Sequence, residues 1–67
     1  MKVMLRENSN GTLLVYVAKK DLEEEVVHET LNDEGRVFTL ANGWELVIAN
    51  LEVPLKLPQT VEARRLA

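Results

Sequence analysis

Short apolar runs interrupted by turn-forming residues constrain the fold of this chain more than any other feature of its sequence. The runs are rich in Val, Thr and Ile, which favour extended backbone. Between them stand the turn segments NSNG, KKDLE, NDEG and ANG, and one longer segment, NLEVPLKLPQ. The pattern predicts an all-β fold of six strands, which we place at Val3–Glu7, Thr12–Ala18, Glu25–Leu31, Arg36–Ala41, Trp44–Ala49 and Thr60–Leu66.

The segment KKDLEEE, residues 19–25, is the one place where helix-forming composition competes with the strand pattern. Lys and Glu favour a helix, and Asp21 is a suitable capping residue for a short one. The β-branched pattern resumes at Val26. We therefore expect a turn or one short helical turn near residues 19–24.

The segment ANG, residues 41–43, determines the register of one hairpin. A two-residue turn at Asn42 and Gly43 would mix apolar residues with Arg36 and Glu45 on one face. A three-residue loop with Gly43 in a left-handed bulge separates them better. One face then collects Phe38, Leu40, Trp44, Leu46 and Ile48. The other face receives Val37, Thr39, Glu45 and Val47. We choose this register, which assigns Asn42 and Gly43 to the turn and Trp44 to the core.

The first hairpin follows the same rule, with residues 9–11 as a three-residue loop. Its inward-facing residues are then Val3, Leu5, Leu13, Val15 and Val17. Its outward-facing residues are Met4, Arg6, Leu14 and Tyr16. A sheet this small, with no helix to cover it, cannot bury one apolar face while it stays flat. We expect it to curl into a small antiparallel barrel or a barrel-like sandwich.

The longest segment without a strand pattern lies between residues 50 and 59. Pro54 and Pro58 interrupt regular pairing there, because proline has no amide donor. The segment also carries apolar residues at alternate positions. We expect these to close one open end of the barrel: Leu51, Val53, Leu55 and Leu57.

Length and composition limit the number of domains and the kinds of site. A chain of 67 residues is expected to form a single domain, residues 1–67, with a small core. The chain has no cysteine, which excludes a disulfide framework or a thiolate metal site. Eight basic and eleven acidic residues give a net charge of −3, which argues against a nucleic-acid surface. No apolar run resembles a signal peptide or a membrane span, so we expect a soluble, cytoplasmic protein.

The only histidine, His28, is the first residue to consider for metal binding or catalysis. Glu24, Glu25 and Glu29 lie nearby in the sequence, but alternation along a strand places His28 and Glu29 on opposite faces. A selective transition-metal site needs three or four convergent ligands. The carboxylates also stand in exposed runs rather than in a cleft. We therefore assign no catalytic residue, metal ligand or cofactor and expect no enzymatic activity.

Three residues near the ends of predicted strands have an alternative role in binding. Trp44 could anchor an interface, but the chosen register favours packing in the core or at the end of the barrel. Arg64 and Arg65 could contact an acidic partner. Solvated arginines that protect a sheet edge are the simpler interpretation.

Charged residues of both signs make the KKDLEE turn the most distinctive surface in the sequence. Its candidate binding residues are Lys19, Lys20, Asp21, Glu23 and Glu24. A solvated turn would also explain them. Mixed charge on an exposed turn can orient a protein partner without contributing to the core.

Three blocks of the sequence, AKKDLEEEVV, TLANGWELVI and LPQTVEARRL, resemble the NifT/FixU family of small nitrogen-fixation proteins. The blocks cover about half of the chain in the order and spacing of that family. The resemblance implies a small barrel-like cytoplasmic protein with an accessory role in nitrogenase maturation. It carries no mechanism.

Three hypotheses about function follow. The first is a non-enzymatic, monomeric accessory protein that binds nitrogenase or a component of its maturation machinery. The second is a metal or cofactor carrier for nitrogenase cluster assembly, which the single histidine and the lack of cysteine oppose. The third is a small nucleic-acid-binding barrel, which would need stacked aromatic residues on a basic face. One Trp, one Tyr and one Phe in an acidic chain oppose it.

Overall fold

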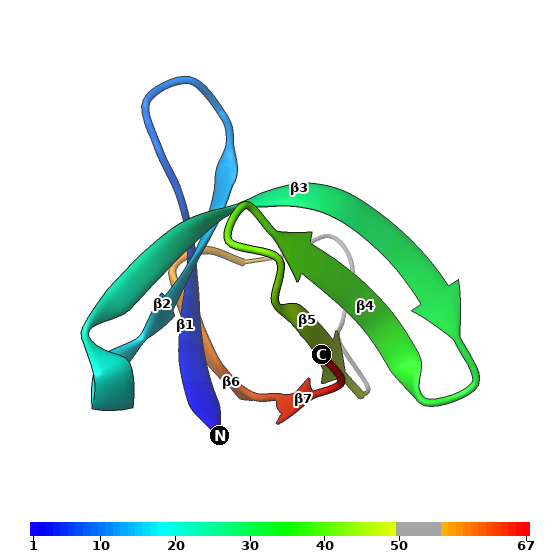
Figure 1. The fold of residues 1–67 in the computed structure, drawn as a ribbon. Helices are drawn as coiled ribbons and strands as arrows, with labels where there is room; N and C mark the ends of the chain where they lie inside the picture. The colour runs from blue at the N-terminus through cyan, green and yellow to red at the C-terminus, as the bar shows by residue number, and fades with distance from the viewer. Residues whose placement is uncertain (50–55) are drawn as a thin grey trace.

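Two segments of the chain change partners along their length, and they close one antiparallel sheet into a barrel (Figure 1). The computed structural model describes residues 1–49 and 56–67. The elements are β1 (Lys2–Glu7), β2 (Leu13–Val17), the 3-10 turn η1 (Ala18–Lys20), β3 (Leu22–Asn32), β4 (Gly35–Leu40), β5 (Glu45–Ile48), β6 (Gln59–Glu62) and β7 (Arg64–Arg65). The strand order is β6-β1-β2-β3-β4-β5-β7. The predicted all-β, barrel-like fold is confirmed, with seven strands in the described residues rather than six.

The partner changes occur in β3 and at the junction of β6 with β7. The first part of β3, up to Glu25, pairs with β2, and the part from Val26 onward pairs with β4. The predicted strand Thr60–Leu66 is divided at Ala63, so that β6 pairs with β1 and β7 with β5. Ala63 and Met1 exchange two main-chain hydrogen bonds of 2.7 Å at this point. The two edge strands of the sheet are therefore consecutive in the chain, which closes the barrel.

The β1–β2 and β4–β5 hairpins have the three-residue loops that the sequence predicts. In the β4–β5 hairpin, the Leu40 N–H donates to the Trp44 carbonyl at 2.8 Å, and the Gly43 N–H donates to the Leu40 carbonyl at 2.9 Å. Gly43 has a φ of +96°, which glycine adopts without steric cost. The Asn42 side chain accepts the Trp44 N–H at 3.0 Å. The same pair of main-chain bonds closes the β1–β2 hairpin over residues 8–12, so both register predictions are confirmed.

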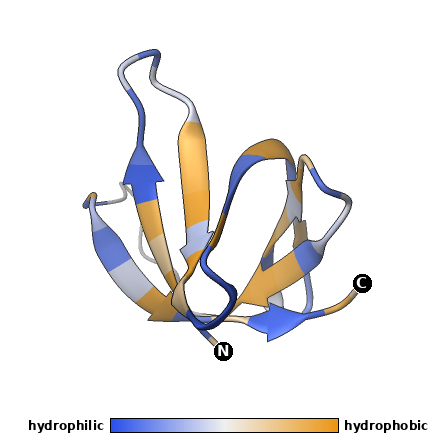
Figure 2. Cartoon of the chain, turned by 60° about the vertical axis from the view of Figure 1, so that its left-hand side comes forward, coloured by the Kyte–Doolittle hydropathy of each residue, from blue (hydrophilic) through white to orange (hydrophobic). Residues whose placement is uncertain are grey.

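The inward-facing residues of the strands meet in one hydrophobic core. The buried residues of this core are Val3, Leu5, Val15, Val17, Phe38, Leu40, Leu46, Ile48 and Ala63. Partly buried residues packed against it are Leu13, Leu22, Val26, Trp44, Leu57 and Val61. Figure 2 shows the corresponding contrast, with hydrophobic colour along the strands and hydrophilic colour at the tip of the β1–β2 hairpin and along β7. Of the residues expected to close one end, Leu57 lies against the core, while Leu51, Val53 and Leu55 lie outside the described residues.

Leu14 corrects the expectation that its side of the first hairpin is open to solvent. It is outward-facing, as predicted, yet only 8% exposed. Leu14 pairs with Arg6 across the strands, and Arg6 reaches over β2 to an ion pair with Glu23 of β3. The apolar stem of an arginine covers hydrophobic surface while its head stays in water. The ion pair therefore keeps the apolar stem of Arg6 over Leu14.

The second half of the barrel buries outward-facing residues in the same way. Val37 and Val47 pair with each other on the face opposite to the core, and both are buried. Arg64 pairs with Val47 across β5 and β7 and forms an ion pair with Glu34. Val37 and Val47 are therefore buried although they face outward, and an arginine that reaches across a strand again lies beside them.

The turn after β2 is shorter than the sequence predicts. The helical turn is a single 3-10 turn at Ala18–Lys20, and β3 already begins at Leu22 rather than at Glu25. Asp21 does not cap the start of this turn. Asp21 ends it in the left-handed conformation, with φ +47° and ψ +46°, and its N–H donates to the Ala18 carbonyl. Cross-strand pairing of the three glutamates with β2 therefore outweighs their helical propensity.

Candidate interaction surface

The five residues predicted as a partner-binding surface do not form one continuous surface. Lys19 and Lys20 are exposed on η1, at one end of the barrel. Asp21 and Glu23 turn toward β1 and β2, where each has an intramolecular partner. Glu24 pairs with the core residue Val15 and is partly buried, in step with its inward-facing neighbours on β3. The fold therefore separates the two lysines from the three acidic residues.

Glu23 is held by a two-point interaction. Its carboxylate oxygens accept hydrogen bonds from Nε and Nη2 of Arg6, both at 2.7 Å. This geometry matches the planar fork of a guanidinium group. The hydrogen bond from Arg6, aided by the opposite charge, holds the pKa of Glu23 below its ordinary value and outweighs the raising effect of desolvation.

Asp21 also acts within the fold. Its Oδ1 accepts a hydrogen bond from the Tyr16 hydroxyl at 3.0 Å. This bond, together with the negative charge of Asp21, raises the pKa of Tyr16. The interaction links the turn to β2 and occupies one of the two carboxylate oxygens.

Trp44 combines the two roles that the sequence left open. Its side chain is partly buried against the core, just after the hairpin loop. Two cations also stand over its ring, with Arg65 Cζ at 3.9 Å and Lys20 Nζ at 5.7 Å from the ring centroid. Both distances are within the range of cation–π attraction. Trp44 therefore joins η1 to β7 at the end of the barrel, and Arg65 is not simply solvated.

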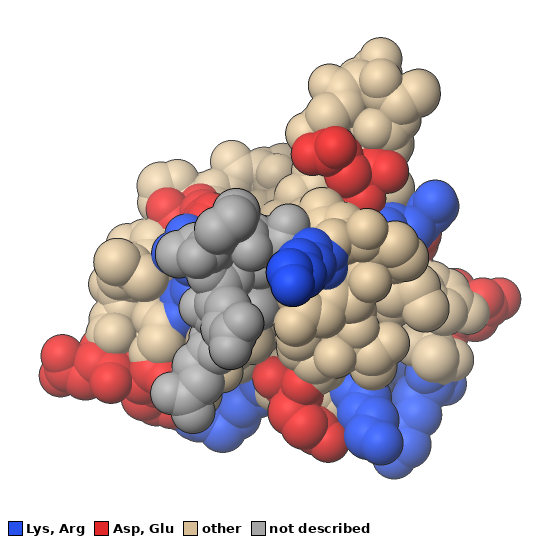
Figure 3. All heavy atoms as spheres, turned by 180° about the vertical axis from the view of Figure 1, so that it is seen from behind, with Lys and Arg blue, Asp and Glu red and all other residues tan. Residues whose placement is uncertain are grey.

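Lys19 borders a shallow hollow beside the chain's amino-terminal strand. The hollow has a volume of about 440 Å³ and is lined by Met1, Lys2, Ala18, Lys19 and Glu62. The amino group of Met1 forms an ion pair of 3.4 Å with Glu62. Figure 3 shows lysine and arginine atoms along this lower edge of the molecule, with acidic atoms between them. The lining of this hollow therefore carries two lysines, the amino group of Met1 and one glutamate.

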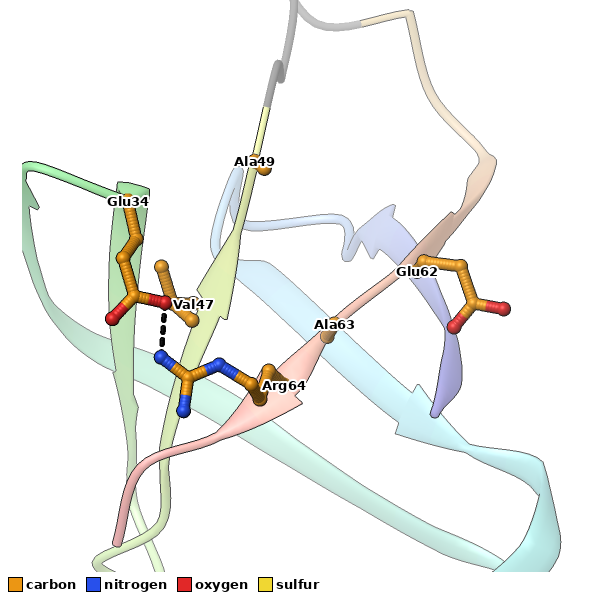
Figure 4. Close-up of a pocket in the computed structure, with 6 residues that line it drawn as sticks. All are labelled: Glu34, Val47, Ala49, Glu62, Ala63 and Arg64. Carbon is orange, nitrogen blue, oxygen red and sulfur yellow. Dashed lines mark hydrogen bonds and ion pairs between the residues drawn. The ribbon is translucent and has the colours of Figure 1, made fainter.

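A second hollow lies at the junction of β6 and β7 and was not predicted from the sequence. It has a volume of about 240 Å³, and its lining residues are Glu34, Val47, Ala49, Glu62, Ala63 and Arg64. Figure 4 shows the Arg64 and Glu34 side chains meeting over Val47, while Glu62 points away from them. Glu34 and Arg64 are 30 residues apart in the chain, so no local sequence pattern could indicate the pair. Glu34 and Arg64 neutralise each other, and the third charged lining residue, Glu62, pairs with the amino group of Met1, so this hollow offers little for a charged ligand.

His28 is exposed on β3. It pairs with Thr39 across β3 and β4. Within residues 1–49 and 56–67, no three His, Cys, Asp or Glu side chains lie close enough to hold a metal ion. The same residues contain no helix long and apolar enough to cross a membrane.

Comparison with known proteins identifies the family. The sequence model described as NifT/FixU protein matches residues 1–63. The chain belongs to the NifT/FixU family. NifT/FixU proteins of similar length support the assignment, and membership associates the chain with nitrogen fixation. Protein NifT of Azotobacter vinelandii is 44% identical over 66 residues, which cover 94% of this chain and 90% of that protein. The Protein FixU homolog of Sinorhizobium fredii is 42% identical over 67 residues, which cover 98% of this chain and 87% of that protein.

A third relative is much longer than this chain. Protein MosB of Rhizobium meliloti is 43% identical over 67 residues, which cover 98% of this chain but 13% of that protein. A NifT/FixU domain therefore occurs both in proteins of about this length and as a small part of a larger one.

Proposed function

We propose that this NifT/FixU chain is a cytoplasmic, monomeric accessory protein without enzymatic activity, which binds nitrogenase or a component of its maturation machinery. The family supports the biological context. The molecular role is inferred from the surface around η1. On this surface Lys19 and Lys20 provide the charge that attracts a partner. Asp21, Glu23 and Glu24 are not included, because the fold separates them from the two lysines.

The observation that carries this proposal is the contrast between arginines and lysines. Three arginines form ion pairs with glutamates of other elements: Arg6 with Glu23, Arg36 with Glu29 and Arg64 with Glu34. Arg65 lies on Trp44. No lysine forms an ion pair with a described residue. The arginine charges are thus used within the fold. Lys19 stays exposed, and Lys20 lies over the Trp44 ring without a carboxylate partner among the described residues.

Lys19 and Lys20 are the two adjacent lysines, and two contacts hold the C-terminal end of their turn. Asp21 bonds to Tyr16 after the turn, and the ring of Trp44 lies beneath Lys20. A charged pair on an anchored turn loses little conformational freedom on binding. Complementary charge at such a rim mainly accelerates and orients association. The expected partner surface is therefore acidic where it meets η1.

Co-purification from cells that are fixing nitrogen tests the proposal. The double variant Lys19→Glu/Lys20→Glu should lose most of the captured nitrogenase or maturation component, while its melting temperature stays close to that of the unaltered protein. The single variants Lys19→Glu and Lys56→Glu provide the matched comparison, since both change the charge equally and both sites are exposed. Only Lys19→Glu should reduce capture.

Two results would contradict the proposal. Equal yields of captured partner from Lys19→Glu and Lys56→Glu would show that η1 is not the binding surface. Failure of the unaltered protein to capture any such component would remove the binding function itself. In a purified nitrogenase assay, addition of the protein should leave substrate turnover unchanged, because the proposed role lies outside catalysis.

A further inference from the structure

The second half of β3 offers an open strand edge. β2 pairs with β3 only as far as Glu25, whereas β3 continues to Asn32 beside β4. Within the described part of the chain, no strand pairs with residues 26–32 on the side away from β4. Figure 1 shows this half of β3 extending with β4 beyond the β1–β2 hairpin. An unpaired edge is a template for another extended segment.

The backbone groups that face this edge follow from the ladder between β4 and β5. The Leu40 N–H donates to the carbonyl of Trp44, the residue just before β5, so the backbone groups of alternate β4 residues, Phe38 and Arg36, face β5. Opposite these two residues lie Glu29 and Leu31 of β3. Backbone groups of Glu29 and Leu31 therefore point away from β4 and are available to an incoming strand.

Side chains at this edge are unusually apolar for a surface. Leu31 is 70% exposed and Val27 is 60% exposed, the highest values among the exposed large hydrophobic residues of the described chain. The strand carries neither lysine nor proline, the residues that commonly block an edge. Both apolar side chains would become partly covered if another strand were added here.

The charge around the edge indicates what kind of strand fits. Residues 22–34 contain no lysine or arginine and carry six acidic residues: Glu23, Glu24, Glu25, Glu29, Asp33 and Glu34. Three of these are neutralised by arginines of other elements. Glu24, Glu25 and Asp33 form no ion pair with a described residue and stand at the two ends of the open edge. A second copy of the chain fits poorly, because antiparallel pairing centred on Glu29 would place Glu25 opposite Asp33 and Glu29 opposite its own copy.

We propose that the β3 edge at residues 26–32 binds an extended segment of a partner protein by strand addition, and that this segment has β-branched residues in its centre and basic residues at both ends. Main-chain hydrogen bonds to Glu29 and Leu31 supply the affinity, and the flanking charges select the segment. This site is separate from the lysines of η1, and it does not depend on the function proposed for them.

Hydrogen exchange measured by NMR provides the test. The probe is a synthetic peptide of about nine residues, with two lysines at each end and alternating threonine and valine between them. Saturating peptide should slow exchange of the Glu29 and Leu31 amides by about tenfold or more, while the Thr30 amide, which faces β4, changes little. A peptide with glutamates in place of the lysines should have no such effect.

Two variants separate edge pairing from charge. Leu31→Pro removes one edge donor without removing a bond to β4, so it should weaken binding of the basic peptide while the chain remains folded. Glu25→Lys/Asp33→Lys leaves the backbone intact and should reverse the preference between the two peptides. The η1 double variant Lys19→Glu/Lys20→Glu should bind the basic peptide as well as the unaltered protein does.

Three results would overturn the proposal. These are unchanged exchange at Glu29 and Leu31 with the basic peptide, equal protection by the acidic peptide, and protection that rises with protein concentration alone. The last result would show that a second copy occupies the edge. None of these results bears on capture through η1.

Discussion

Gly35 is the position where a single added methyl group should do the most damage to the barrel. It begins β4 and pairs with Asn32, and its φ is +148°. A Cβ atom at this position would lie 2.4 Å from the Ile48 carbonyl oxygen and 2.9 Å from the Ala49 Cα. Both neighbours are backbone atoms of the chain leaving β5, so they cannot rotate away. Gly35→Ala must therefore separate β4 from β5.

Two effects contribute to the expected loss of stability. A non-glycine residue in this backbone region costs about 1–3 kcal/mol, and forcing packed elements apart costs about 1–3 kcal/mol more. The free energy of unfolding should thus fall by about 2–6 kcal/mol. A folded chain of this length has roughly 3–10 kcal/mol in total, so the variant should be largely or partly unfolded at room temperature.

Gly43→Ala is the matched control for this experiment. Gly43 also has a positive φ, but no atom lies within 4 Å of the Cβ position, so only the conformational cost of about 1–2 kcal/mol applies. Urea unfolding followed by far-UV circular dichroism measures both variants without depending on Trp44, which adjoins Gly43. Equal destabilisation by the two substitutions would refute the argument from close approach of the strands.

Two further predictions concern the outer face of the β1–β2 hairpin and the adjoining part of β3. Leu14→Ala should lower the free energy of unfolding by about 2 kcal/mol, since Leu14 is buried under Arg6. Met4 lies on the same face and is 38% exposed, so Met4→Ala should lower it clearly less in the same urea titration. Equal losses from the two substitutions would contradict the covering role of Arg6. The lowered pKa of Glu23 stabilises the folded state above the ordinary carboxylate pKa, and this contribution disappears as the pH falls through the lowered value. The unaltered protein should therefore melt at a higher temperature than Arg6→Met near neutral pH, and this difference should disappear in acid. A difference that stays constant down to about pH 2 would exclude a contribution from the ion pair.

The hairpins could be predicted from sequence because their register is a local property. In both, a glycine with positive φ closes a three-residue loop, and alternation of polarity selects one register over its neighbour. Strand composition also predicted the fold class. The division of the last strand at Ala63 could not be predicted in the same way, because it results from a change of partner between β1 and β5.

The errors in the sequence interpretation share a physical cause. KKDLEEE has helical composition, but β3 begins within it because its residues pair with β2. Leu14 and Val47 occupy the outward side of their strands and are nevertheless buried. Arginine pairs cover both, and the partners are 17 and 30 residues apart in the chain. Alternation along one strand contains no information about such contacts.

The candidate sites could not be predicted fully for the same reason. The sequence shows which residues are charged, but not which of them form ion pairs or hydrogen bonds within the fold. KKDLEE looks like one mixed-charge surface, yet Asp21 and Glu23 bond to Tyr16 and Arg6, while the lysines remain exposed. Among the charges without an ion pair to a described residue are two groups of opposite sign: the lysines of η1, and Glu25 and Asp33 at the ends of the β3 edge. A partner with acidic and basic regions could occupy both at once. Salt would weaken either interaction, so variants at η1 and at β3, rather than ionic strength, are what can distinguish the two surfaces.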